Sequence, residues 1–205
     1  MEHLHSLDIV HGSLQPSNVL ISVPTGTIGP AIKLTDFGLR YLGKARNNSF
    51  DSSTSAEDQS AELRAACIAT EGWVTPDTKL TRASDIFPFG CLMGFVLIDG
   101  FHPFGADVVE RVPRIVKKQP MVLTLQQLEN VVGFAAAHIH SLIQSMVNSE
   151  ASERPTVTQV LASPFLNGQM TNTEPVLTTS SFNQTGNLFS ILYILSKYTI
   201  IFFRL

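Results

Sequence analysis

Charged residues and cysteines are both scarce in this chain. Asp, Glu, Lys and Arg make up 15% of the 205 residues and leave a formal net charge of −3 at pH 7. This balance gives no reason to expect nucleic acid or an anionic membrane surface as a partner. The two cysteines, Cys67 and Cys91, are too few for a disulfide framework, and Cys91 lies in an apolar run typical of a core. We therefore expect a reducing, cytoplasmic compartment.

The sequence also shows no signal peptide and no apolar run of the roughly 20 residues that a membrane-spanning helix needs. Its most apolar end, residues 188–205, follows a polar linker at residues 169–187 and contains Lys197 between its apolar residues. We expect this tail to be β-prone and aggregation-prone, because it is rich in Ile, Tyr and Phe and has no Pro. We expect no membrane contact except through residues 188–203.

Two short apolar stretches near the N-terminus are separated by a turn-rich segment. Val19 to Ile21 and Ala31 to Leu34 flank residues 24–30, which contain Pro, Gly and Thr. Apolar stretches on either side of turn-forming residues predict a β-hairpin. Because a hairpin brings its outer ends together, we expect Asn18 and Asp36 to be neighbours. An amide and a carboxylate oxygen suit Mg²⁺ when the phosphates of a ligand complete its coordination.

The same residues form a longer pattern. His11 to Asn18, with the spacing His-x-x-Leu-x-Pro-x-Asn, is followed by Asp36-Phe37-Gly38. The two motifs together resemble the catalytic loop and the metal-binding turn of protein kinases. The resemblance implies that Asn18 and Asp36 bind Mg²⁺ and nucleotide, and that His11 and Phe37 are packing residues of the loop.

The resemblance also shows where this sequence departs from the kinase pattern. Ser13 stands in the position of the Asp that accepts the substrate hydroxyl's proton, and a neutral hydroxyl is no useful base at pH 7. Loss of a positioned base costs on the order of 10²–10⁴-fold in rate. Gln15 replaces a Lys that would stabilise the transferring phosphoryl group. Gly12 replaces the Arg that receives an activation-loop phosphate.

Three further residues have structural roles by resemblance. Asp77 occupies the place of the Glu in the Ala-Pro-Glu motif, which implies a buried ion pair with Arg154. The alternative for both residues is an ordinary surface pair, worth little. Asp85 matches the residue that holds the catalytic-loop backbone in kinases.

Apolar spacing predicts helices downstream. Ser84 is expected to be the N-cap of an apolar helix that ends near Gly100 and that Pro88 kinks at its start. Helical spacing recurs over residues 123–132 and 132–147, and residues 155–166 resemble the last helix of a kinase lobe. Histidines two positions apart, such as His3 and His5, face different sides of a helix and predict surface or hydrogen-bonded positions, not a metal site.

The expected fold is mainly α with short β-hairpins. It corresponds to the C-terminal (lower) lobe of the protein kinase-like fold over residues 1–168, with the upper lobe absent. Residues 47–66 are polar and Ser-rich, and we expect them to be a disordered insertion in the activation loop. The strings LHSLDIVH and G-x-HPFG resemble the inositol-requiring kinase–endoribonuclease family, the sensors of the unfolded protein response, which act at the cytosolic face of the endoplasmic reticulum membrane.

Three functions remain open at this stage. The first is a pseudokinase lobe of the serine/threonine type that binds or scaffolds, with another kinase-like protein as partner. The second is a diverged ATP-dependent serine/threonine kinase that is active only in a fuller-length form. The third is a truncated product with little function. ATP and Mg²⁺ are expected to bind weakly or not at all, because nothing in the sequence matches a Gly-rich phosphate loop or its strand lysine.

Overall fold

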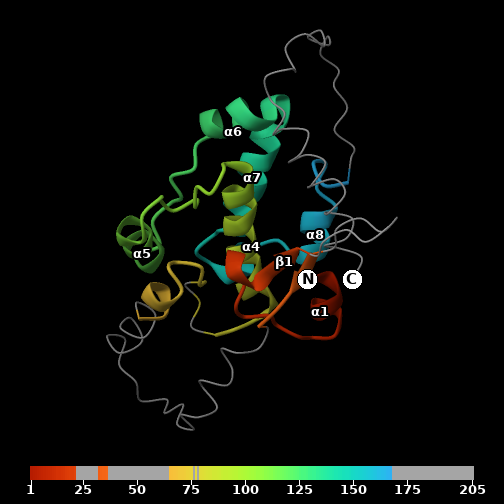
Figure 1. Cartoon of the computed structure of the whole chain (residues 1–205). Helices are drawn as coiled ribbons and strands as arrows, with labels where there is room; N and C mark the ends of the chain where they lie inside the picture. The colour runs from red at the N-terminus through yellow and green to blue at the C-terminus, as the bar shows by residue number, and fades with distance from the viewer. Residues whose placement is uncertain (22–31, 37–64, 76, 78, 168–205) are drawn as a thin grey trace.

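The computed structural model describes residues 1–21, 32–36, 65–75, 77 and 79–167. Within these residues the chain is mostly helical, with one small sheet (Figure 1). The α-helices are α1 (Glu2–Ser6), α4 (Arg82–Leu97), α5 (Val108–Val116), α6 (Leu125–Val132), α7 (Ala136–Met146) and α8 (Val157–Leu161). Short 3-10 turns are η1 (Pro16–Asn18), η2 (Gly133–Ala135) and η3 (Ala151–Glu153), and the strands are β1 (Val19–Ile21) and β2 (Ile32–Leu34).

The hairpin predicted near the N-terminus is present. Strands β1 and β2 pair antiparallel, and Val19 lies opposite Leu34 while Ile21 lies opposite Ile32. Residues 24–30, the expected turn, lie outside the described residues. Because η1 leads directly into β1, the pairing of β1 with β2 brings the end of η1 close to the residues that follow β2.

The apolar helix α4 forms the centre of the core. Its Ile86, Phe87 and Cys91 are each at most 1% exposed, and in Figure 1 α4 stands beside α7 in the middle of the molecule. Gly90 permits this close approach, because a Cβ atom there would lie 2.8 Å from the Cβ of Met146. The prediction that Cys91 is a core residue is confirmed.

The start of α4 differs from the prediction. The helix begins at Arg82 after the N-cap Thr81, and Ser84 is its third residue, not its cap. Thr81 and Ser84 form a reciprocal capping box in which the Ser84 hydroxyl accepts a hydrogen bond from the Thr81 backbone N–H at 2.9 Å. The helix continues through Pro88 and ends at Leu97, before the expected Gly100.

The later helices are confirmed in part. Helices α6 and α7 occupy the two predicted ranges, joined by η2. Helix α8 is shorter than expected, because it ends at Leu161. Helix α5 was not predicted. The Asp107 carboxylate caps it by accepting a hydrogen bond from the Val109 N–H at 2.8 Å.

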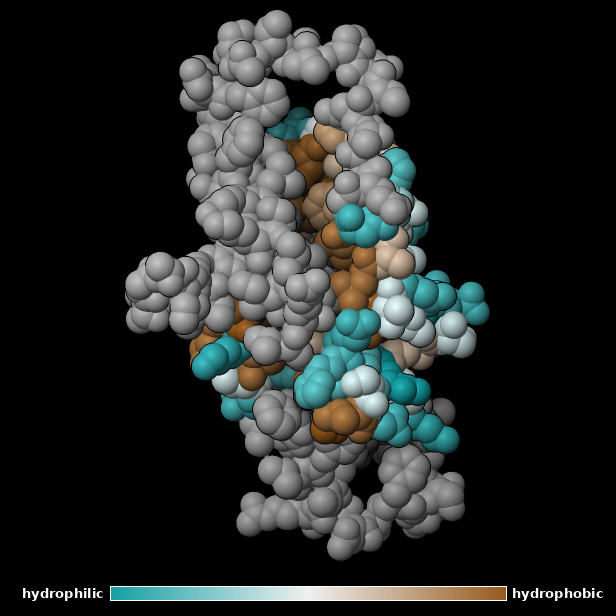
Figure 2. All heavy atoms as spheres, turned by 90° about the vertical axis from the view of Figure 1, so that its right-hand side faces the viewer, coloured by the Kyte–Doolittle hydropathy of each residue, from teal (hydrophilic) through white to brown (hydrophobic). Residues whose placement is uncertain are grey.

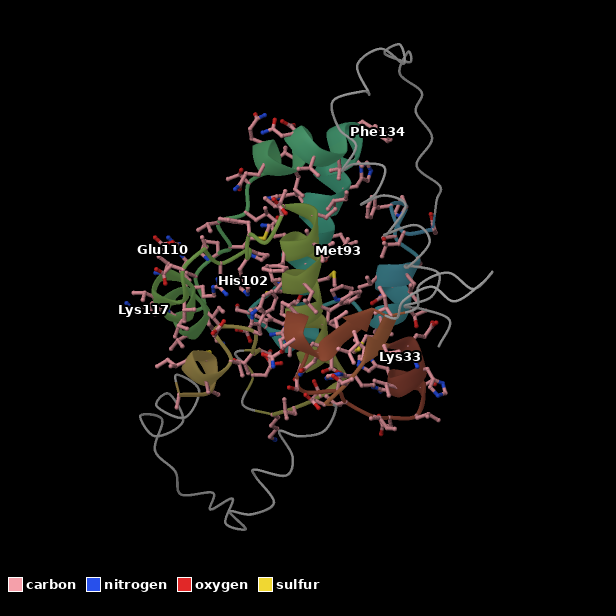
Figure 3. The ribbon with its side chains drawn as sticks, viewed as in Figure 1. Lys33, Met93, His102, Glu110, Lys117 and Phe134 are labelled. Carbon is pink, nitrogen blue, oxygen red and sulfur yellow. The ribbon has the colours of Figure 1, made fainter. Side chains whose placement is uncertain are left out.

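Apolar side chains also reach one face of the molecule. Figure 2, which looks at the right-hand side of Figure 1, shows a vertical hydrophobic band with hydrophilic residues to its right and below it. Met93 of α4 points toward that side in Figure 3 and is 6% exposed. No helix within the described residues is long and apolar enough to cross a membrane. The polar linker and the apolar tail of the prediction lie beyond those residues.

Candidate functional site

Ser13 and Asn18 are held together by two hydrogen bonds. The Asn18 Nδ2 group donates to the Ser13 backbone oxygen at 2.7 Å and to the Ser13 Oγ at 3.1 Å. Asn18 ends η1 and is 4% exposed, and its backbone N–H donates to the Gln15 oxygen at 3.0 Å. The amide nitrogen is thus committed to the loop, and Gln15, the N-cap of η1, is half-buried beside it.

Asp36 is placed near Asn18 through the backbone. The Thr35 N–H donates to the Asn18 oxygen at 2.9 Å, so Asp36 follows directly after the last bond of the hairpin. Asp36 is exposed and has a φ of 59°, in the left-handed region that Asp adopts more readily than most residues. Phe37 and Gly38, the rest of the motif, lie outside the described residues.

Asp85 of α4 organises the loop that carries Ser13. Its carboxylate is 0% exposed and accepts hydrogen bonds from the backbone N–H of His11 at 2.8 Å and of Gly12 at 2.7 Å. This is the contact that the kinase resemblance implied for Asp85. Gly12 has a φ of 70°, a conformation that glycine adopts without a Cβ penalty, so the residue that replaces the kinase Arg also suits the turn.

His5 is a third partner of Asp85 that the sequence did not reveal. Its Nε2 lies 2.9 Å from Asp85 Oδ2, and the histidine is 6% exposed. Eighty positions separate the two residues, and no local pattern connects residues so far apart. The interpretation of His5 as a histidine with satisfied hydrogen bonds agrees with this contact, but its partner was missed.

His11 packs inside the loop as expected. It is 0% exposed, and its Nδ1 accepts a hydrogen bond from the Ser13 N–H at 3.2 Å. Burial lowers the pKa of His11, and the nearby Asp85 charge opposes this only in part. The ring therefore remains neutral at pH 7 and supports the backbone at Ser13.

Asp77 and Arg154 form a bidentate ion pair in the interior. Arg154 Nη1 donates to Asp77 Oδ2 and Nη2 donates to Asp77 Oδ1, each at 2.7 Å, and the two side chains are 0% and 7% exposed. Burial alone would raise the pKa of Asp77, but the hydrogen bonds and charge of Arg154 outweigh it and lower that pKa. The alternative of an ordinary surface pair is therefore wrong.

The remaining donors of Arg154 are also used. Nε donates to the Asn148 oxygen at 2.7 Å, Nη2 to the Ser149 oxygen at 3.3 Å, and the guanidinium carbon lies 5.2 Å from the ring centroid of Phe87. The pair thus ties the segment around Asp77 to α4 and to the loop after α7.

A second buried arginine fixes the turn that precedes Asp77. Arg111 of α5 is 7% exposed, and its Nη1 donates to the Glu71 oxygen at 3.0 Å. Glu71 and Gly72 both have positive φ values, 52° and 83°. This contact was not predicted, although the spacing of Val108, Val112 and Ile115 could have indicated the amphipathic helix that carries Arg111.

His102 is buried next to this turn. It lies between α4 and α5 in Figure 3, and its ring centroid is 4.6 Å from that of Trp73 in an edge-to-face arrangement. Its Nδ1 accepts a hydrogen bond from the Phe104 N–H at 3.1 Å. Burial lowers the pKa of His102 to about 3, and the charge of Arg111 contributes to the shift.

The donor set around Ser13 suits a nucleotide-bound cation only in part. Asn18 and Asp36 offer one amide oxygen and one carboxylate, which are the hard ligands that Mg²⁺ prefers. Within the described ranges, no cluster of three or more His, Cys, Asp or Glu could hold a metal. Asn18 and Asp36 would therefore need the phosphates of a nucleotide to complete the coordination of a cation.

Residues 1–166 match the family model "Protein kinase domain". The match covers most of the chain, and the chain therefore belongs to the protein kinase family. Within that family it resembles the IRE1 type. It is 35% identical over 172 residues to the human serine/threonine-protein kinase/endoribonuclease IRE2. It is 31% identical over 169 residues to the Caenorhabditis elegans serine/threonine-protein kinase/endoribonuclease ire-1.

A fission yeast relative has a name that states its role. The Schizosaccharomyces pombe "Sensor for unfolded proteins in the ER ire1" is 31% identical over 181 residues. Each of these three alignments covers 80% of this chain but only 16% or 17% of the relative. The chain thus spans about a sixth of the length of the curated relatives it matches.

Proposed function

We propose that this chain is a catalytically impaired pseudokinase lobe of the serine/threonine type, which acts by binding or scaffolding and not by phosphoryl transfer. The proposal assigns the described residues to the lower lobe of the kinase fold. It places the chain in the cytoplasm and links it to the unfolded protein response, because an IRE1-type relative is named a sensor of unfolded proteins. The proposed partner is another kinase-like protein.

The observation that carries the proposal is Ser13 in the position of the catalytic Asp. The Ser13 Oγ already accepts a hydrogen bond from Asn18 Nδ2 at 3.1 Å, and a hydroxyl cannot take up a proton at pH 7. The position thus has neither the charge nor the basicity of a carboxylate. By contrast, two structural contacts that the kinase resemblance implied are present: the hydrogen bonds from the loop to Asp85 and the ion pair between Asp77 and Arg154. The architecture is kept while the proton acceptor is lost.

ATP with Mg²⁺ is the ligand that the family implies. Asn18 and Asp36 would hold the metal, and the bound metal would neutralise charge on the phosphates. The contribution of this chain is to orient Asn18 through its bonds to Ser13 and to present Asp36 at the end of the hairpin. We propose weak nucleotide binding, because no motif in the sequence matches the Gly-rich loop that covers the phosphates in kinases.

Phosphotransfer assays on the purified chain test this proposal. Radiolabelled ATP and Mg²⁺ are supplied with a generic protein substrate to the wild type, to Ser13→Ala and to Asp36→Asn, each alone and with an upper kinase lobe supplied. We expect all three proteins to give the same background, and all three to melt cooperatively by circular dichroism. Mg²⁺-dependent transfer by the wild type that Asp36→Asn abolishes would instead establish the diverged kinase. A wild type without a cooperative melt would leave the truncated, non-functional product.

A further inference from the structure

An apolar surface separate from the site around Ser13 lies along one side of α4. Phe89, Met93 and Val96 are spaced at i, i+4 and i+7 and therefore share one face of this helix. Met93 points toward the side of α8 in Figure 3, which is the side that Figure 2 faces. Val96, near the C-terminal end of α4, is 42% exposed. A helix that is apolar on all sides, as α4 is, is normally covered on each of them.

Helix α7 continues this surface on its side away from α5. His140 faces the segment after α5, because its Nε2 lies 3.1 Å from the Leu123 oxygen. His138 and Leu142, each two positions from His140, face the other way. There they line a pocket of about 280 Å³ together with Phe165 of the segment after α8. The pocket thus lies between α7 and the end of the described chain.

Several large apolar side chains on this side of the molecule keep surface in contact with water. Phe134, which precedes α7 and lies on the same side in Figure 3, is 60% exposed. Phe89, Leu142 and Phe165 are only partly buried. We call Phe89, Val96, Phe134, Leu142 and Phe165 the α4–α7 face, and the hydrophobic band of Figure 2 lies on the same side. Apolar surface of this kind marks a place where another segment or molecule binds.

The chain leaves the described residues beside the α4–α7 face. Asn167 is the last of them, and its N–H donates to the Ser163 oxygen at 3.0 Å while its Nδ2 donates to the Ala162 oxygen at 2.9 Å. These bonds fix the exit point of the chain against the end of α8. Ser163 and Phe165 themselves line the pocket. The polar linker that follows therefore begins at the wall of this pocket.

The tether to the apolar tail is long enough to reach every part of this face. Residues 168–187, which include the polar linker, separate the exit point from the tail, and a coil of about 20 residues has a root-mean-square end-to-end distance of about 25 Å. Helix α4, with 16 residues, is about 24 Å long. A tether of this kind also holds the tail at an effective concentration on the order of millimolar, which favours the tail of the same chain over that of a second copy.

The tail and the face also match in chemistry. Of residues 188–203, 12 of 16 are apolar and Lys197 is the only charged residue. The pocket lining likewise contains no Asp, Glu, Lys or Arg. Lys197 can lie along the edge of such a surface with its hydrocarbon stem buried and its ammonium group in water. The tail is too short for an ordinary membrane-spanning helix, so packing on protein is the favoured way to remove it from water.

We propose that residues 188–203 dock on the α4–α7 face of their own chain. The tail removes Val96, Phe134 and Leu142 from water, and the face in turn covers the Ile and Phe side chains of a segment that would otherwise aggregate. The tail thus completes the packing of α4 on the side that α7 leaves open. This inference is independent of the proposed pseudokinase role, because it involves neither Ser13 nor nucleotide.

Disulfide cross-linking in the full chain tests the docking directly. Val96→Cys is combined with Ile194→Cys or with Ile200→Cys, and each purified protein is oxidised under mild, native conditions. The native Cys67 and Cys91 are 0% exposed and do not compete. We expect an intrachain disulfide in at least one of the two double variants, because a docked tail brings the introduced thiols within bonding distance. Its yield should not depend on protein concentration.

Val109→Cys is the matched control. Val109 is also an exposed valine on a helix, at 77%, but it lies on α5, which Figure 1 shows on the opposite side of α4 from α8. Paired with the same tail cysteines it should give at least about fivefold less intrachain disulfide, because there the thiols meet only through the tether. Equal yields from Val96 and Val109 would overturn the proposal. Disulfides formed only between two chains, with the mass of a dimer by light scattering, would assign the face to a second copy and would also overturn it.

A double-mutant cycle completes the test. Val96→Asp and Ile194→Asp should each lower the urea midpoint of the full chain, and together they should lower it by clearly less than the sum, because either charge already undocks the tail. Val109→Asp combined with Ile194→Asp should instead be additive. An Ile194→Asp midpoint equal to that of the wild type, or additive shifts for Val96 and Ile194, would contradict the docking. Flotation of the wild type with phosphatidylcholine vesicles would assign the tail to a membrane and would equally overturn the proposal.

Discussion

Replacing Asp77 by Asn should cost this protein a large share of its stability. The substitution keeps the shape of the side chain but removes the charge that Arg154 binds through two 2.7 Å bonds. Arg154 is 0% exposed in its side chain, so its charge would remain buried without a counterion. Breaking a buried pair by removing one partner costs about 3–5 kcal/mol, against a typical total of about 5–15 kcal/mol.

The pH dependence gives an independent check on the same pair. The pKa of Asp77 is lowered in the folded state, so its stabilisation is present above the unfolded value of 3.8 and is lost as the pH falls through the lower folded value. Below about pH 4 the wild type should therefore lose stability more steeply than Asp77→Asn.

Urea denaturation followed by circular dichroism, at pH 7 and through the acid range, measures both effects. Glu150→Gln is the matched control, because it removes the carboxylate from an ion pair with Lys118 whose side chains are 51% and 61% exposed. It should cost at most about 1 kcal/mol. Equal costs for Asp77→Asn and Glu150→Gln at pH 7, together with parallel acid profiles, would refute the reasoning.

Two further predictions follow from buried positions. His102 has a pKa of about 3 when folded and 6.5 as a model value, so the unfolded chain binds a proton that the native state excludes, and stability should fall as the pH drops between these values. His102→Asn should make this slope shallower in urea titrations, with a remainder from His11, whose pKa burial also lowers, and an unchanged slope would contradict the prediction. Gly90→Ala should lower the free energy of unfolding by about 1–3 kcal/mol, since the new Cβ would lie 2.8 Å from the Cβ of Met146. A thermal melt matching the wild type would argue against that close contact.

The hairpin and helices α6 and α7 could be predicted from patterns of neighbouring residues in the sequence. The hairpin follows from apolar stretches around turn residues, and its register sets Thr35 against Asn18. Helices α6 and α7 follow from apolar spacing. The start of α4 was misplaced because Thr81 and Ser84 are both good cap residues, and only the reciprocal hydrogen bonds identify Thr81 as the N-cap. Helix α5 was not predicted, although the spacing of Val108, Val112 and Ile115 fits an amphipathic helix that continues past Pro113.

Contacts between distant segments could be predicted only where a resemblance named both partners. The sequence motifs suggested Asp77 with Arg154 and Asp85 with the loop, and the structure brings both sets together. No motif named His5 or Arg111, whose partners lie 80 and 40 positions away. His5 and Arg111 find these partners because the folded chain buries their side chains together, and that burial depends on the complete fold.

The large sequence separation between Asp85 and the residues that it binds has a consequence for folding during synthesis on the ribosome. His11 binds Asp85, which is synthesised 74 positions later in the chain, and Asp77 binds Arg154, which follows 77 positions later. Closing such wide loops is slow, because the chain loses conformational entropy before the hydrogen bonds between its ends can form. The loop that carries Ser13 can therefore make these hydrogen bonds only after α4 has been synthesised.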